Sequence, residues 1–111
     1  MAGTFDTETP KSSNYEILRG VVERLLKDLQ DGAGDRDKRR QVEEWMRSLA
    51  DKFPEFRVDQ GLRDYYLAEA KRLRDDFEKA NDIIEKVAIG RSMEGYLDRA
   101  SESEKKMTER A

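Results

Sequence analysis

Apolar positions along the chain recur at steps of three and four residues, which is the pattern of amphipathic α-helices. Glycine, proline and aspartate, which end or cap helices, separate the apolar stripes. We therefore predict four helices, at about 14–31, 36–53, 60–89 and 92–108. Residues 1–12 are polar, contain Pro10 and lack periodicity, so we predict a disordered tail ahead of one helical domain at 13–111.

The stretch LQDGAGDRDKRR, Leu29 to Arg40, is interpreted as the turn between the first two helices. Its glycines do not have the spacing of a phosphate-binding loop, and its aspartates do not have that of a calcium loop. Gly32 suits the end of the first helix, and Asp35 or Asp37 can cap the second. Pro54 ends the second helix, whose predicted apolar stripe is Val42, Trp45, Met46, Leu49, Ala50 and Phe53.

The third apolar stripe has heptad spacing. From Tyr66 the steps alternate between four and three residues through Ala70, Leu73, Phe77, Ala80, Ile84 and Val87. A continuous helix over 60–89 would be about 45 Å long. The register fails at Gly90, where a displaced stripe begins: Ile89, Met93, Tyr96, Leu97, Ala100 and Met107. Either Gly90 ends the helix or one longer helix turns another face to another partner, and we favour the break.

The predicted fold is all-α: a helical hairpin packed on a long third helix, plus a short C-terminal helix, like a bundle or coiled coil. The third helix is longer than the first two, so we expect another chain to cover part of it and predict a homo-oligomer. The function predicted first is a non-enzymatic protein–protein interaction module, such as an oligomeric adaptor, assembly factor or regulator. Its predicted interface consists of Tyr65, Tyr66, Phe77, Ile84, Ile89, Met93, Tyr96 and Leu97.

Composition narrows the possible chemistry. Among 111 residues, 36% are hydrophobic and 42% charged, so the core must be lean. The absence of histidine and cysteine excludes Ser-His-Asp and Cys-His catalysis and ordinary zinc sites. We therefore assign no catalytic residue, metal or cofactor. The stretch MAGTFDTETPKSS has no apolar core of the kind found in secretory signals, and no apolar run approaches about 18 residues. We therefore expect an intracellular, cytoplasmic protein without a secretory signal and without membrane contact.

The basic residues at the start of the second helix support an alternative function. Arg36, Lys38, Arg39 and Arg40 lie where the helix dipole favours acids, so they are a possible polyanion contact of a nucleic-acid-associated regulator. The competing interpretation is a solvated helix start. The run is short and interrupted by acids, and the net charge of the chain is −3, so we do not expect nucleic acid to be its main partner.

A row of carboxylates supports a more remote alternative. Asp75, Glu78, Asp82 and Glu85 would lie one turn apart on a continuous third helix, and such a row could hold Mg²⁺ or Mn²⁺ in a carboxylate enzyme. Lys79 and Lys86 are interleaved with it. That pattern favours a solvated, salt-bridged helix face.

The stretch IGRSMEGYLDRASESEKKM, Ile89 to Met107, resembles the last helix of microtubule-interacting-and-trafficking domains. Those helices often carry Tyr-Leu-Asp-Arg-Ala followed by spaced leucines. Tyr96 to Ala100 match that motif, whereas Ser103 stands where a leucine is expected. The resemblance covers less than a fifth of the chain and implies a helix, with no function carried over.

Overall fold

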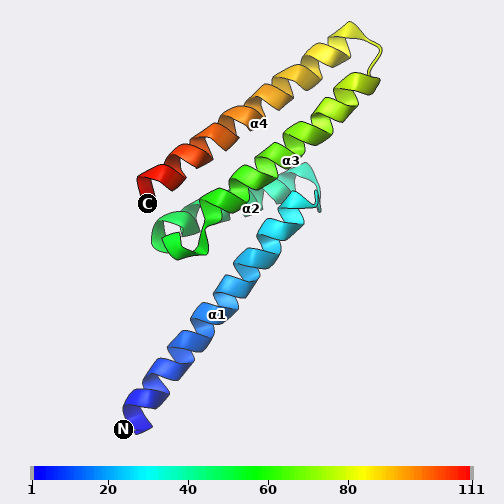
Figure 1. Cartoon of the computed structure of the whole chain (residues 1–111). Helices are drawn as coiled ribbons and strands as arrows, with labels where there is room; N and C mark the ends of the chain where they lie inside the picture. Colours follow the sequence, from blue (N-terminus) through cyan, green and yellow to red (C-terminus); the bar gives the residue numbers. More distant parts are fainter. Residues whose placement is uncertain (1, 111) are drawn as a thin grey trace.

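Four α-helices follow one another along the chain in the computed structural model, which describes the backbone of residues 2–110 and the side chains of residues 14–110 (Figure 1). They are α1 (Ala2–Gln30), α2 (Arg36–Lys52), α3 (Val58–Lys79) and α4 (Ile83–Arg110), with a short 3₁₀ helix, η1 (Pro54–Phe56), between α2 and α3. The described part of the chain contains no strand, and the predicted all-α class is confirmed. The backbone of α1 is helical from Ala2, and the predicted tail at 1–12 precedes the described side chains.

The link between α1 and α2 is a turn held by local caps. The Asp35 carboxylate accepts a hydrogen bond of 2.9 Å from the backbone N–H of Lys38, which satisfies one of the free donors at the start of α2. Gly32 has a φ of +78°, a conformation that side chains disfavour. The guanidinium of Arg72, from α3, lies against Gly32 and donates to the carbonyl of Gln30 at the end of α1.

The third and fourth helices differ in length from the prediction. α3 ends at Lys79 and α4 begins at Ile83, so the chain turns at 80–82 and the predicted break at Gly90 is wrong. Asp82 explains this start, because its side chain accepts from the backbone N–H of Ile84 at 3.2 Å and its carbonyl accepts from Lys86 at 3.0 Å. Gly90 lies inside α4, which is the longer of the two helices.

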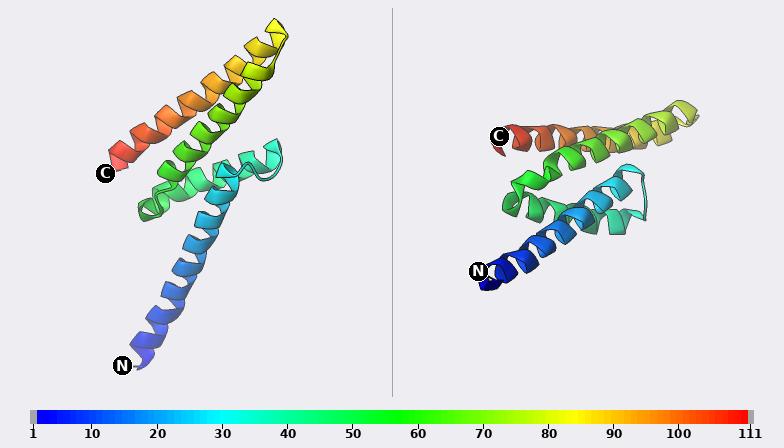
Figure 2. Two further views of the ribbon diagram at one scale, coloured as in Figure 1. Left: turned by 45° about the vertical axis from the view of Figure 1, so that its right-hand side comes forward. Right: turned by 60° about the horizontal axis from the view of Figure 1, so that its bottom comes forward.

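α3 and α4 form an antiparallel hairpin, and α1 and α2 pack against the first half of α3 (Figures 1 and 2). α2 crosses α3 instead of running along it, and α1 packs mainly on α3. The chain also reverses from α1 into α2, as predicted for the first two helices, but the more extensively packed hairpin is α3–α4. α4 folds back over α3 and covers much of the stripe for which the sequence predicted a partner chain.

The core lies where α1, α2 and α4 pack against the first half of α3. Its buried residues are Val22, Leu26, Leu29, Met46, Leu49, Ala50, Phe56, Val58, Leu62, Tyr65, Tyr66 and Ala100. α2 is rotated relative to the predicted stripe: Glu43 is buried, whereas Trp45, predicted as core, is 40% exposed. The rotation is favourable because Glu43 finds a hydrogen-bond partner on α3, as described below, and the wide indole stays at the edge.

Candidate functional site

The eight predicted interface residues do not form one surface. Tyr65 and Tyr66 are both buried within the chain, so neither is available to a partner. The Tyr96 ring completes an aromatic cluster with them, at centroid distances of 6.4 and 6.2 Å. Ile84 and Leu97 are exposed, whereas the remaining three are half-buried: Phe77, Ile89 and Met93.

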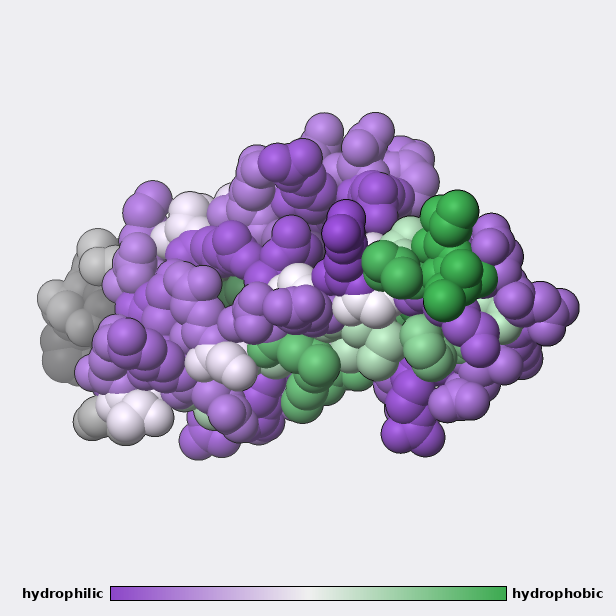
Figure 3. All heavy atoms as spheres, turned by 90° about the horizontal axis from the view of Figure 1, so that it is seen from above, coloured by the Kyte–Doolittle hydropathy of each residue, from purple (hydrophilic) through white to green (hydrophobic). Residues whose placement is uncertain are grey.

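Apolar side chains gather instead at the far end of the α3–α4 hairpin. Ile83 and Ile84 are each 75% exposed, and Val87 is 50% exposed. Together with the half-buried Phe77 they form what we call the tip surface. Seen from above, an apolar patch lies at the end of the molecule that carries the α3–α4 turn (Figure 3).

The tip surface is uncovered because the rest of the molecule packs elsewhere. The buried residues of α3 run from Val58 to Ala70, the half against which α1 and α2 pack. On α4 the buried residues are Ala100 and Ser103, both in its second half. Among the described residues, the second half of α3 and the first half of α4 pack mainly against each other. Two helices alone cannot enclose a hydrophobic core.

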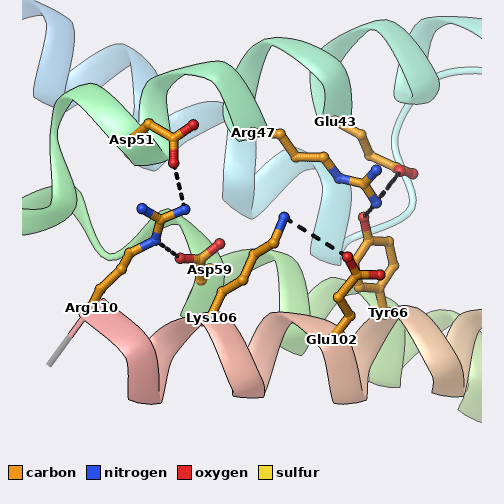
Figure 4. Close-up of polar contacts among 8 residues, drawn as sticks. All are labelled: Glu43, Arg47, Asp51, Asp59, Tyr66, Glu102, Lys106 and Arg110. Atoms are coloured by element: carbon orange, nitrogen blue, oxygen red, sulfur yellow. Dashed lines mark hydrogen bonds and ion pairs between the residues drawn. The ribbon is translucent and has the colours of Figure 1, made fainter.

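Arginines join the helices by pairing with buried carboxylates (Figure 4). Glu43, Asp59 and Glu69 are each at most 9% exposed. At the end of α4, Arg110 contacts Asp59 at 2.6 Å and Asp51 of α2 at 2.8 Å. Glu69 pairs with Arg39, at 3.5 Å, and with Arg72. A buried carboxylate is tolerated only when it is paired and hydrogen-bonded, so these contacts fix how the helices pack.

Tyr66 connects α3 to α2 within this set of contacts (Figure 4). Its hydroxyl accepts a hydrogen bond of 2.6 Å from Arg47 and donates one of 3.1 Å to Glu43. Burial raises the pKa of Tyr66 to about 12, and the Glu43 carboxylate adds to that rise. The hydroxyl therefore keeps its proton at neutral pH and remains a donor to Glu43.

We expect Arg110→Ala to lower the free energy of unfolding by about 1–3 kcal/mol, because the buried Asp59 carboxylate loses its charged partner. Urea denaturation followed by circular dichroism measures the change. Lys105→Ala is the control on the same helix, since Lys105 is exposed and joins none of the ion pairs among the described residues. Equal losses in the two variants would contradict a specific role for Arg110.

The second candidate site is a pocket of about 550 Å³ between α2 and α4, which we call the arginine pocket. Of the predicted polyanion contacts, Arg36, Arg39 and Arg40 line it, whereas Lys38 does not. Sequence reasoning missed three further arginines in its wall: Arg47, Arg91 and Arg99. A signal was present, because Arg91, Gly95 and Arg99 recur at four-residue steps and so share a helix face. That this face meets α2 depends on the turn at 80–82.

The predicted carboxylate row is divided by the same turn. Asp75 and Glu78 lie on α3, Asp82 lies in the turn and Glu85 lies on α4. Among the residues that the structure describes, no three acidic side chains are grouped so as to hold a metal ion. The described helices also include none with the length and apolar character needed to cross a bilayer.

Ser103, where the resemblance to trafficking domains would place a leucine, is buried at 7% exposure. A serine there leaves room for α4 to lie close to its neighbours. No protein-family model, curated protein or solved structure matches this chain.

Proposed function

We propose that this chain is a non-enzymatic helical interaction module, and that it associates with a second copy of itself through the tip surface. The observation that carries the proposal is the exposure of Ile83, Ile84 and Val87 at the end of a projecting hairpin. Adjacent exposed isoleucines are unfavourable in water, and burying them against a partner recovers free energy of roughly 25 cal/mol per Å² of apolar area.

The charges around the tip surface favour a second copy over a strongly charged partner. Lys79, Asp82, Glu85 and Lys86 flank its residues in the sequence, and the Lys86 ammonium lies over the Phe77 ring, 5.4 Å from the centroid. In a two-fold symmetric dimer the same patch meets itself, so the lysines of one copy can face the acids of the other. A rim with both signs of charge is self-complementary in such a pairing, whereas a partner of one sign would meet repulsion.

The test is the absolute mass, measured by light scattering on a sizing column at several protein concentrations and two salt levels. We expect a dimer, at twice the chain mass of 13.0 kDa. Ile84→Asp should weaken the dimer at least tenfold, because a charge would be buried in an apolar contact. Circular dichroism should report unchanged helicity, since Ile84 is 75% exposed within the chain.

Ile17→Asp is the matched control. Ile17 is also an exposed isoleucine on a helix, at 65% exposure, but it lies on α1, away from the α3–α4 turn. A dimer that survives Ile84→Asp and is lost with Ile17→Asp would place self-association on α1 and refute the tip surface. A monomer at all concentrations would refute self-association, and the tip surface would then have to serve a different protein.

A further inference from the structure

The arginine pocket gathers positive charge from two helices that are distant in sequence. Four of its arginines come from α2 and two, Arg91 and Arg99, come from α4. Two glutamates share the wall, Glu43 and Glu44. The whole chain carries a net charge of −3, so this basic surface lies within an otherwise acidic molecule. Clustered guanidinium groups repel one another, and a bound anion would offset that repulsion.

Several of these guanidinium groups are free to bind a ligand. Glu43 is occupied by Tyr66 and Arg47, and Glu44 pairs with Arg40 at 3.8 Å. The ion pairs formed by the described residues include none with Arg36, Arg91 or Arg99.

One detail of the wall favours a bound anion. The Arg99 guanidinium lies over the Tyr96 ring, with its carbon 5.4 Å from the centroid. Such stacking holds the planar group in a defined orientation.

We propose that the arginine pocket binds a compact chain of phosphate groups, either a free oligophosphate or the phosphate chain of a nucleotide. Guanidinium groups present paired N–H donors that match two phosphate oxygens at once, which lysine cannot do. Among the described residues, six arginines and no lysine line the wall. The ligand is compact because the basic surface lines a hollow of about 550 Å³, and because a long nucleic acid would also lie along the acidic remainder of the chain.

The experiment is isothermal titration calorimetry of the full chain with sodium tripolyphosphate at about 50 mM salt, repeated at about 200 mM salt. We expect one site per chain and an affinity that falls as salt increases. Arg91→Glu should weaken binding at least tenfold without loss of helicity, because Arg91 is exposed and contributes to no ion pair among the described residues. Gly95→Glu should have a similar effect, because Gly95 lines the pocket, a Cβ there meets no neighbouring side chain within 4 Å, and the added carboxylate brings negative charge to the wall.

Arg74→Glu provides the matched control, because it reverses the charge of an exposed arginine on α3 that does not line the pocket. If Arg74→Glu weakened binding as much as Arg91→Glu, the effect would be a general one of net charge and the proposal would fail. Absence of binding to tripolyphosphate at low salt would also overturn it.

Two further ligands separate the sources of the phosphate. Adenosine triphosphate binding more tightly than tripolyphosphate identifies a nucleotide, and the reverse order identifies a free oligophosphate. The third outcome is that a single-stranded oligonucleotide of about 20 residues binds more tightly than either, with the same sensitivity to Arg91→Glu. That outcome would overturn the proposal of a compact ligand and identify nucleic acid as the ligand. The pocket shares no residue with the tip surface, so failure of either proposal leaves the other standing.

Discussion

Replacing Tyr66 with alanine is expected to lower the free energy of unfolding by about 3–5 kcal/mol. The side chain is fully buried and packs against the rings of Tyr65 and Tyr96, so its removal leaves a cavity at the centre of the core. It also removes the hydroxyl that accepts from Arg47 and donates to Glu43. Small domains have a total stability of about 5–15 kcal/mol, so such a loss is a large part of it. Urea denaturation monitored by circular dichroism measures the difference.

Tyr66→Phe separates the two contributions. It keeps the ring in the core and removes only the hydroxyl. We expect a loss of about 1–3 kcal/mol, because Glu43 loses its hydrogen-bond donor on α3 and Arg47 loses its acceptor. If Tyr66→Phe cost as much as Tyr66→Ala, the hydrogen bonds between α2 and α3 would outweigh the packing of the ring. If neither variant lost stability, the buried position of Tyr66 would be wrong.

Gly61→Val is expected to destabilise the protein by about 2–3 kcal/mol, because it overpacks the place where α1 crosses α3. A Cβ at Gly61 would lie 2.6 Å from Cδ1 of Leu26 and 3.0 Å from its Cδ2. Leu26 is itself in the core, at 7% exposure, so it has little room to move. The same denaturation experiment measures the change.

Gly90→Ala is the opposite case and the control. Apart from its own helix backbone and chain neighbours, a Cβ there would meet no described atom within 4 Å. Alanine should therefore stabilise α4 by up to about 1 kcal/mol through its higher helix propensity. In a Leu26→Ala background, Gly61→Val should cost less than in the parent protein, because the clashing side chain is gone. If Gly61→Val lowered the free energy of unfolding equally in both backgrounds, the contact with Leu26 would not be the cause of the destabilisation.

Proline and aspartate signals located several helix ends correctly from the sequence. Asp35 caps α2, and α2 ends at Lys52, two residues before Pro54. These signals work because capping and proline geometry involve neighbouring residues only. The basic residues that open α2 were also identified, and three of the four line the arginine pocket. Local chemistry was therefore visible in the sequence.

The turn at 80–82 was hidden by the heptad spacing. Phe77, Ala80, Ile84 and Val87 continue the steps of three and four residues across a place where the chain reverses. The spacing would place these four side chains on one face of a continuous helix, so periodicity gave no sign of the reversal. The cap formed by Asp82 was the local sign of the turn, and Asn and Asp compete with helix continuation by bonding their own backbone.

The residue pattern is enough to establish that the chain is helical, that a turn joins the first two helices and that apolar residues continue to Val87. Which helix faces meet depends on how the helices pack. Because α4 folds back on α3, Tyr65 and Tyr66 are buried, and Arg91 and Arg99 reach the arginines of α2. The physical reason is that periodicity and capping act over a few residues, whereas burial and charge clustering depend on contacts between residues far apart in the chain.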